Sequence, residues 1–199
     1  IDSYVYFRYC IRSLQFILNM EIIDNFLPKD EFDKLEKTVM GYRFPWYYQD
    51  EIAYGSETKK SWEFNHYHLG INQLYHQLYG NDVPTYPNSL ELVWPAIKQL
   101  GMRKDKFQLR TLVRIKINCF PNQKEFIEHS WHEDYEPGTL PYKACLLSLN
   151  TCDGYTKLKT GEKIESVANR AILFDPCISH HSTNTTNQTR RVNININYL

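Results

Sequence analysis

Two residues late in the chain, His132 and Asp134, could bind a metal ion together. In an extended segment, residues two positions apart point to the same face, so this His-x-Asp pair can reach a single ion. A third ligand must come from another segment, and the best source is the run 174–181, which ends in His180 and His181. Two imidazoles and one carboxylate on one face of an octahedron leave three positions open. That arrangement suits non-haem Fe(II), which can bind O2 and a chelating co-substrate there.

The remaining histidines leave alternatives at this stage. His180 and His181 are adjacent, and adjacent strand residues point to opposite faces, so only one of them can be a ligand. His129 reads as a loop or supporting residue, and it would be a ligand only if His132 were not. His66 and His68 form a His-x-His pair with zinc-like spacing, but we assign no third ligand to them and expect an ordinary structural role.

The C-terminal segment 191–197 alternates between two kinds of side chain. Its apolar members are Val192, Ile194 and Ile196, and its polar members are Arg191, Asn193, Asn195 and Asn197. A strand face of one arginine and three asparagines is unusual to bury unless it lines a polar pocket. A guanidinium in such a pocket can hold a carboxylate in a bidentate pair. Arg190 is one residue out of phase with this face and should point away from it.

Together, His132-x-Asp134, His180 and Arg191-x-Asn193 resemble the 2-oxoglutarate- and Fe(II)-dependent dioxygenases, in particular the prolyl-4-hydroxylase-like oxygenases that include marine bacterial and phage forms. The segment 166–175 resembles that family's strand leading into the distal histidine, and Asp153-Gly154-Tyr155-Thr156 resembles an earlier turn. The similarity covers roughly residues 109–199. It implies a double-stranded β-helix, the jelly-roll or cupin-like core.

The resemblance also implies roles for single residues. His132, Asp134 and His180 would be the iron ligands, with His180 preferred over His181 because its distance from Phe174 matches the family. Arg191 would pair with the distal carboxylate of 2-oxoglutarate. Asn193 stands where the family has a serine, and its amide can still donate to a carboxylate. Asn118 stands where the family often has a tyrosine that binds the co-substrate; it either contacts the co-substrate or is a plain ladder residue.

The implied activity is hydroxylation of an unactivated C–H bond in a peptide, a prolyl residue or a small molecule, with O2 consumed and succinate and CO2 released. Ascorbate would be a supporting reductant. Related halogenases lack the carboxylate ligand, so the presence of Asp134 favours hydroxylation. Two alternatives are a jelly-roll module that binds metal without turnover, and a hydrolase that uses zinc or another divalent metal at the same site.

The N-terminal half of the chain is expected to form helices that support this site. The run from Pro28 to Gly41 has an apolar stripe of Phe32, Leu35 and Val39, which predicts an amphipathic helix. Residues 71–79 predict a second helix. Residues 89–100 predict a third, whose regular part Pro95 should confine to the later half. The aromatic run 44–48 is either a lid over the metal pocket or an aromatic edge of the core.

Strands follow, with alternating residues over 108–120 and 191–198 and apolar runs over 142–149 and 171–174. Short strands at 155–158 and 163–167 flank a turn at Thr160-Gly161. We therefore predict a mainly β protein, one domain over 1–199 with helices packed on a jelly-roll core. Residues 1–19 would be an extra helix or non-native, 20–105 a helical and aromatic support region, and 106–199 the core with the metal site.

The amino-acid composition disfavours some classes of binding partner and some cellular locations. The 199 residues carry 23 basic and 23 acidic side chains, and this zero net charge disfavours nucleic-acid binding. Five cysteines without a CxxC pair argue against a disulfide framework and predict a reducing, cytoplasmic location. No apolar run is long enough to span a membrane. The oligomeric state is left open.

Overall fold

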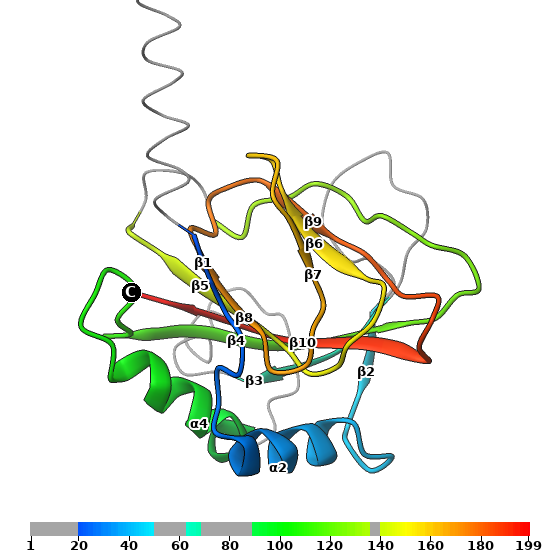
Figure 1. Ribbon diagram of the computed structural model, residues 1–199, viewed down its shortest axis with the longest axis horizontal. Helices are drawn as coiled ribbons and strands as arrows, with labels where there is room; N and C mark the ends of the chain where they lie inside the picture. The colour runs from blue at the N-terminus through cyan, green and yellow to red at the C-terminus, as the bar shows by residue number, and fades with distance from the viewer. Residues whose placement is uncertain (1–19, 50–62, 69–88, 136–139) are drawn as a thin grey trace, which may run out of the picture.

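The computed structural model describes residues 20–49, 63–68, 89–135 and 140–199. In this part of the chain two antiparallel sheets face each other, and two helices cover the outer face of the larger sheet (Figure 1). This is the mainly β, double-stranded β-helix architecture predicted from the sequence, with the helices packed on it.

The larger sheet has seven strands in the order β1-β8-β5-β10-β4-β3-β2. Its strands are β1 (Glu21–Ile23), β2 (Tyr47–Gln49), β3 (Glu63–His68), β4 (Leu112–Pro121), β5 (Lys143–Ser148), β8 (Ala171–Phe174) and β10 (Arg190–Tyr198). The longest ladder joins β10 to β4, with Arg191 opposite Phe120 and Asn193 opposite Asn118. Residues directly opposite in a ladder share a face of the sheet, so this register places the polar residues of β4 and β10 side by side.

The smaller sheet has the order β7-β6-β9, from β6 (Tyr155–Leu158), β7 (Lys163–Glu165) and β9 (His180–Ser182). Two isolated bridges, Glu128 with Thr183 and His132 with His180, run along the free edge of β9. The segment 128–132 thereby extends the smaller sheet and holds the His-x-Asp motif next to the distal histidine segment.

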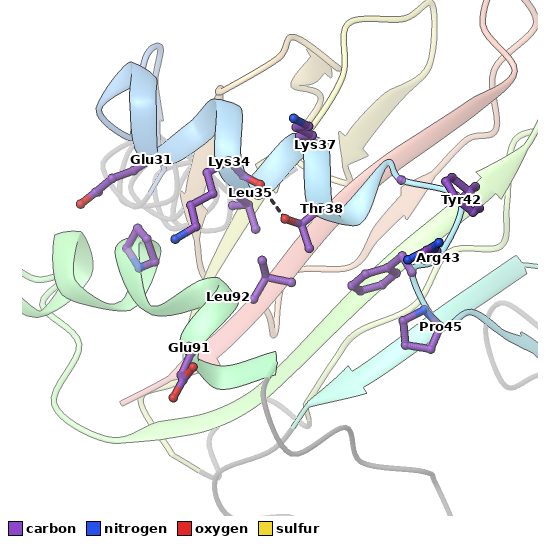
Figure 2. A pocket seen from close by; sticks show the side chains of 13 residues that line it. Glu31, Lys34, Leu35, Lys37, Thr38, Tyr42, Arg43, Pro45, Glu91 and Leu92 are labelled. Atoms are coloured by element: carbon purple, nitrogen blue, oxygen red, sulfur yellow. Dashed lines mark hydrogen bonds between the residues drawn. The ribbon is translucent and has the colours of Figure 1, made fainter.

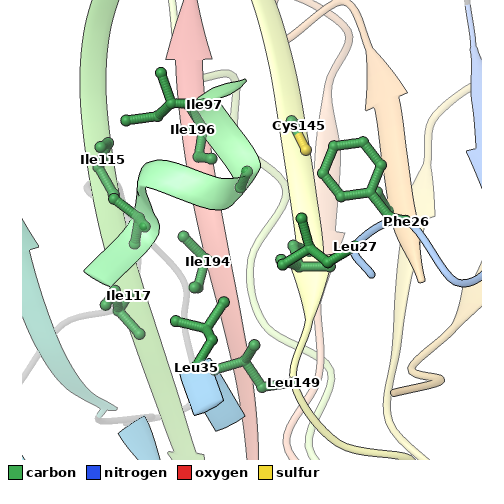
Figure 3. Close-up of a cluster of buried hydrophobic side chains, with 14 of the residues drawn as sticks. Phe26, Leu27, Leu35, Ile97, Ile115, Ile117, Cys145, Leu149, Ile194 and Ile196 are labelled. Atoms are coloured by element: carbon green, nitrogen blue, oxygen red, sulfur yellow. The ribbon is translucent and has the colours of Figure 1, made fainter. Parts of the chain in front are cut away.

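Helix α2 (Lys29–Val39) and helix α4 (Ser89–Gly101) form a core with the outer face of the larger sheet. The predicted stripe of α2 is buried there, together with alternate residues of β4, β5 and β10. Figure 3 shows Ile194 and Ile196 of β10 facing Leu35 and Ile97 of the two helices. Burial of this apolar face turns the opposite residues of β10, the arginine and asparagines, toward the smaller sheet.

A second apolar cluster fills part of the space between the sheets. It joins Leu146 of β5 and Phe174 of β8 to Leu158 of β6 and Ile164 of β7. This cluster lies on the β5 and β8 side of the sandwich, so the space over β4 and β10 is left to polar side chains.

Asn169 connects the segment after β1 to the segment before β8. Its backbone φ is +60°, and its side-chain amide both accepts from the Leu27 N–H and donates to the Leu27 carbonyl, each at 2.9 Å. Asparagine tolerates this left-handed conformation better than most residues. One buried side chain therefore ties the segment after β1 to the segment before β8.

Several sequence predictions need correction. The third helix runs unbroken from Ser89 through Pro95 to Gly101, so the prediction that Pro95 confines it to its later half is wrong. Because proline has no backbone N–H, Pro95 cannot donate to the carbonyl of Glu91, four residues earlier. Glu91 is exposed, so water can replace the lost hydrogen bond. The strands β1, β2, β3 and β9 were not predicted. The helix predicted over 71–79 lies outside the described residues.

The aromatic run 44–48 lies partly in the helix-side core. Phe44 and Trp46 pack against that core, with their ring centroids 4.8 Å apart. Of the two interpretations of this run, an aromatic edge of the core therefore describes Phe44 and Trp46. Among the described residues, neither helix has the length and hydrophobicity to cross a bilayer.

Candidate metal centre

Three side chains from two segments converge at one end of the sandwich. One donor atom from each of His132, Asp134 and His180 lies within 4.8 Å of the other two. The backbones of His132 and His180 exchange a pair of hydrogen bonds of 2.9 and 2.8 Å, and the chain then bends so that the Asp134 N–H donates to the Pro176 carbonyl. The motif is thus extended at His132 and bends at Asp134, and the cross-strand bridge brings the distal histidine beside it.

Hydrogen bonds to carbonyls fix the tautomer of both histidines. The Nδ1 of His180 lies 2.8 Å from the Ile178 carbonyl, and the Nδ1 of His132 lies 3.2 Å from the Ser130 carbonyl. A carbonyl oxygen only accepts, so each Nδ1 carries the hydrogen and each Nε2 presents a lone pair. Burial, followed by the neighbouring His180, lowers the pKa of His132. A neutral imidazole with a free Nε2 is the form that binds a metal.

Asp134 is held by three donors. The amides of Asn195 and Asn197 donate to its Oδ2 at 3.0 and 3.1 Å, and Arg114 forms an ion pair with its Oδ1 at 3.1 Å. Burial would raise the pKa of this carboxyl, but the charge of Arg114 and the hydrogen bond from the Asn195 amide hold it well below its usual range. Asp134 is therefore a fixed carboxylate anion.

Arg191 lies in the same polar layer and is 1% exposed. It donates through Nη1 to the Thr183 carbonyl at 3.0 Å and through Nη2 to the Thr156 hydroxyl at 2.9 Å, while its Nε has no partner. Burial lowers its pKa to about 10, so it stays protonated at neutral pH. No carboxylate among the described residues pairs with it. A buried guanidinium with only neutral partners is costly unless an anion joins it.

Further orphaned polar atoms surround this arginine. Of six buried side-chain atoms without a hydrogen-bond partner in the described chain, four belong to this polar layer: Asn118 Oδ1, His129 Nε2, Arg191 Nε and Asn195 Oδ1. Native proteins leave few such atoms unsatisfied. Asn118 donates to the Asn193 Oδ1 at 2.9 Å, so these two predicted co-substrate residues touch each other beside Arg191. The layer has the donor and acceptor content of a site for a polar ligand.

Gly154 lets Arg191 reach this position. A Cβ at residue 154 would lie 2.5 Å from the Asn184 carbonyl oxygen and 2.6 Å from the Arg191 Cδ. Gly154 and Thr156 belong to the turn motif identified in the sequence, and the structure shows that this motif packs around the guanidinium.

The structure separates the paired alternatives. His180 faces Asp134, whereas His181 packs against Trp131 with ring centroids 4.3 Å apart. Arg191 lies in the polar layer, whereas Arg190 donates to the Met40 carbonyl on the helix side. The His-x-His pair of the sequence lies in β3, where the backbone register places His66 opposite Ile117 and His68 opposite Ile115.

Sequence reasoning did not find Arg114, Thr156 and Thr183 as partners of the site. Arg114 was visible as a polar alternate in its strand, but nothing in the sequence says that β4 lies beside β10 and beneath Asp134. Its contact depends on the order of strands in the sheet.

A cavity of about 760 Å³ exists elsewhere, between α2, α4 and the turn that follows α2 (Figure 2). Its lining includes Lys34, Arg43 and Glu91 and none of the residues of the metal group or the polar layer. It lies on the helix side of the larger sheet, so it is separate from the candidate metal centre.

The arrangement suits a divalent metal and an anionic ligand. Two imidazoles and one carboxylate form a donor set that leaves part of an octahedron open. Asp134 contributes one negative charge, while Arg114 and Arg191 contribute two positive charges, so a bound metal would leave the site with excess positive charge. An anion reaching from the metal to Arg191 would balance it.

No family model matches this chain, and no curated protein matches it significantly. Solved structures do match in fold. A prolyl hydroxylase from Trichoplax adhaerens, solved with a peptide fragment of hypoxia-inducible factor, is 15% identical with a TM-score of 0.59, covering 100% of this chain and 94% of its own. A 2OG-Fe(II) oxygenase-family oxidoreductase from Burkholderia pseudomallei is 10% identical with a TM-score of 0.55, covering 94% and 88%.

A prolyl-4-hydroxylase from Pseudomonas putida is 14% identical with a TM-score of 0.50, covering 90% of this chain and 91% of its own. At these identities the similarity establishes the fold: this chain has the double-stranded β-helix architecture of 2OG-Fe(II) oxygenases.

Proposed function

We propose that this protein is an Fe(II)- and 2-oxoglutarate-dependent oxygenase that hydroxylates an unactivated C–H bond. The observation that carries the proposal is the pairing of a His-Asp-His group with a buried, charge-unpaired arginine in the same layer. The metal group alone would suit several metals. Arg191 adds a demand for an anion, and the oxygenase fold is consistent with that combination.

In the proposed site, His132 and His180 offer Nε2 lone pairs and Asp134 offers a carboxylate oxygen to the iron. The carbonyls of Ser130 and Ile178 hold the rings in the required tautomer. The amides of Asn195 and Asn197 hold the carboxylate. Because every ligand is oriented before metal arrives, little reorganisation is needed on binding. Bound iron would supply the redox chemistry that couples O2 and 2-oxoglutarate to C–H oxidation.

Arg191 binds the distal carboxylate of 2-oxoglutarate in this proposal. Its Nη atoms already have Thr156 and Thr183 as partners, which orient the guanidinium, while no carboxylate within the described ranges compensates its charge. Asn118 and Asn193 border the same space and supply amide groups. The buried surroundings exclude water, and an ion pair is stronger there than at a surface.

The substrate is proposed only by class. A peptide or prolyl substrate is consistent with the fold shared with the two prolyl hydroxylases, and a small metabolite is the second class. Zero net charge gives no reason to prefer a nucleic acid as the substrate.

The test is anaerobic reconstitution with Fe(II), addition of 2-oxoglutarate and air, and measurement of succinate. The proposal predicts succinate release that requires both iron and 2-oxoglutarate and that increases with a true substrate from a panel of prolyl peptides and small metabolites. Protein that binds one iron but releases no succinate under any condition would instead indicate a metal-binding module. Hydrolysis of an ester or phosphoester panel with zinc, unaffected by Arg191→Ala, would indicate a hydrolase.

A further inference from the structure

His129 has one ring nitrogen without a partner in the polar layer. The residue is 5% exposed. Its Nδ1 lies 2.8 Å from the Ser182 hydroxyl, and its Nε2 is buried with no hydrogen-bond partner among the described residues. A buried, unsatisfied polar atom costs about 1–3 kcal/mol. The other ring nitrogen, Nδ1, is already held by Ser182. The cost at Nε2 therefore indicates that this atom forms a hydrogen bond to a ligand.

The backbone pairing places His129 between the metal group and Arg191. Glu128 bridges Thr183 and His132 bridges His180, so the segment containing His129 runs alongside β9 from the arginine end toward the metal end. Arg191 donates to the Thr183 carbonyl at the first of these points. A molecule that extends from the metal to Arg191 therefore passes His129.

Phe120 confirms that the imidazole and the guanidinium are neighbours. The Phe120 ring centroid lies 5.0 Å from that of His129 and 5.7 Å from the central guanidinium carbon of Arg191. Phe120 is opposite Arg191 in the ladder and has no polar atom of its own. His129 is therefore the polar side chain that lies next to Arg191 on this side of the polar layer.

The imidazole is neutral and can present a hydrogen at Nε2. Burial, then the charge of Arg191, lowers its pKa to about 3. One nitrogen then carries the only ring hydrogen. The Ser182 hydroxyl can donate to Nδ1, which leaves that hydrogen on Nε2, and a carboxylate, which only accepts, selects this tautomer.

We propose that His129 Nε2 donates a hydrogen bond to the carboxylate held by Arg191, and that His129 thereby sets a preference for 2-oxo acids with a distal carboxylate. The inference rests on the proposed function and assigns a second recognition residue to its co-substrate. His129 and Arg191 approach that carboxylate from different strands. Arg191 supplies charge, and His129 supplies a directional donor.

The test measures binding without turnover. Protein loaded with Mn(II), a redox-stable substitute for Fe(II), is titrated by calorimetry with 2-oxoglutarate and with 2-oxopentanoate, which has the same carbon chain but ends in a methyl group. His129→Asn keeps an amide near Nδ1 and cannot reach the ligand, whereas His129→Gln places an amide near Nε2. His181→Leu is the matched control, because His181 faces Trp131 on the other side of β9.

We expect His129→Asn to weaken 2-oxoglutarate binding at least about tenfold, as for a lost hydrogen bond to a charged group, and to change 2-oxopentanoate binding less than about twofold. His129→Gln should restore most of the 2-oxoglutarate affinity, and His181→Leu should retain it. Equal Mn(II) affinity in all variants shows that they are folded.

Two outcomes overturn the inference in distinguishable ways. If wild-type protein binds 2-oxoglutarate and His129→Asn binds it equally well, or loses both ligands equally, His129 has no role at the distal carboxylate while the proposed function stands. If wild-type protein binds Mn(II) but no 2-oxoglutarate, the proposed function fails and this inference fails with it.

Discussion

At the scale of residues, the site is defined by which polar atoms have partners and which do not. Hydrogen bonds orient each of His132, Asp134 and His180 and leave one atom of each side chain available to bind a metal. Arg191 is buried, and its hydrogen-bond partners in the described part of the chain are neutral. The sequence pointed to all four residues: strand alternation placed Arg191 in phase with its asparagines and allowed only one of His180 and His181, and the family resemblance favoured His180. The donors that hold Asp134 could not be predicted, because they come from strands joined only in the folded sheet.

Loss of a single ligand should abolish metal binding. His132→Ala and Asp134→Ala each remove one of three donors, and we expect neither variant to retain stoichiometric Fe(II) after anaerobic reconstitution and desalting. Iron content by a ferrozine assay checks this, with His181→Leu as a control that should bind normally. Wild-type iron affinity in His132→Ala would contradict the ligand assignment.

Removal of the arginine charge should affect the co-substrate and spare the metal. In Arg191→Ala the distal carboxylate would lose its buried counter-charge, so we expect the 2-oxoglutarate concentration for half-maximal succinate release to rise by about two orders of magnitude. Iron content should stay at the wild-type value. An unchanged 2-oxoglutarate requirement would show that Arg191 contacts no co-substrate.

Arg114 and a bound metal both compensate the charge of Asp134. Arg114→Met removes a part-buried ion pair, and we expect it to destabilise the metal-free protein by about 2 kcal/mol. The loss should be smaller when Mn(II) is saturating, because the metal then supplies the positive charge. Thermal unfolding with and without Mn(II) measures both values, and the exposed Arg110→Met is the control. An equal loss in the two conditions would mean that Arg114 does not act through Asp134.

At the scale of elements, the site depends on close approach between strands and turns. The long alternating strands β4 and β10 were predictable, because each repeats its pattern over several residues. The short strands β1 and β9, with three residues each, were not, because they have too few residues to show a period and form only through their neighbours. The Gly154 turn was recognised by resemblance, and the structure supplies its physical reason.

Gly154→Ala should disturb Arg191. The added methyl group would meet backbone at Asn184 and the Cδ of Arg191, so we expect a loss of stability of about 1–3 kcal/mol together with weaker 2-oxoglutarate binding. Gly101→Ala is the control, because a Cβ there meets nothing within 4 Å. Urea unfolding and calorimetry measure the two effects. A Gly154→Ala protein with normal stability and affinity would refute the close packing around Arg191.

Asn169 offers a test of how the N-terminal strand is attached. Both Asn169→Gly and Asn169→Ala remove two buried hydrogen bonds to Leu27, for which we expect a loss of about 2 kcal/mol. The alanine variant should lose about 1 kcal/mol more, because its Cβ opposes the left-handed backbone that glycine accepts. Urea unfolding measures the free energy of unfolding of both variants. Equal losses of stability in the two would exclude a contribution from the backbone conformation.

At the scale of the whole molecule, the two faces of the larger sheet have different roles. The helix side is apolar and carries most of the core, and the opposite face carries the polar layer and the metal group. This division was predictable from the alternation of β10. The size of the sheet was not, because three of its strands come from the part of the chain expected to be helical and aromatic support. The helix-side cavity also had no sequence signal, since its lining comes from α2, α4 and the turn after α2.

We expect one metal and one 2-oxo acid to bind together between the His-Asp-His group and Arg191. Anaerobic titration of the Fe(II)-loaded protein with 2-oxoglutarate tests it, because chelation of Fe(II) by the 2-oxo acid produces a visible metal-to-ligand charge-transfer band. We predict a band that saturates at one equivalent in the wild-type protein, is absent in His132→Ala, and requires far more 2-oxoglutarate in Arg191→Ala. A wild-type protein that holds one Fe(II) and shows no band at any 2-oxoglutarate concentration would contradict the account.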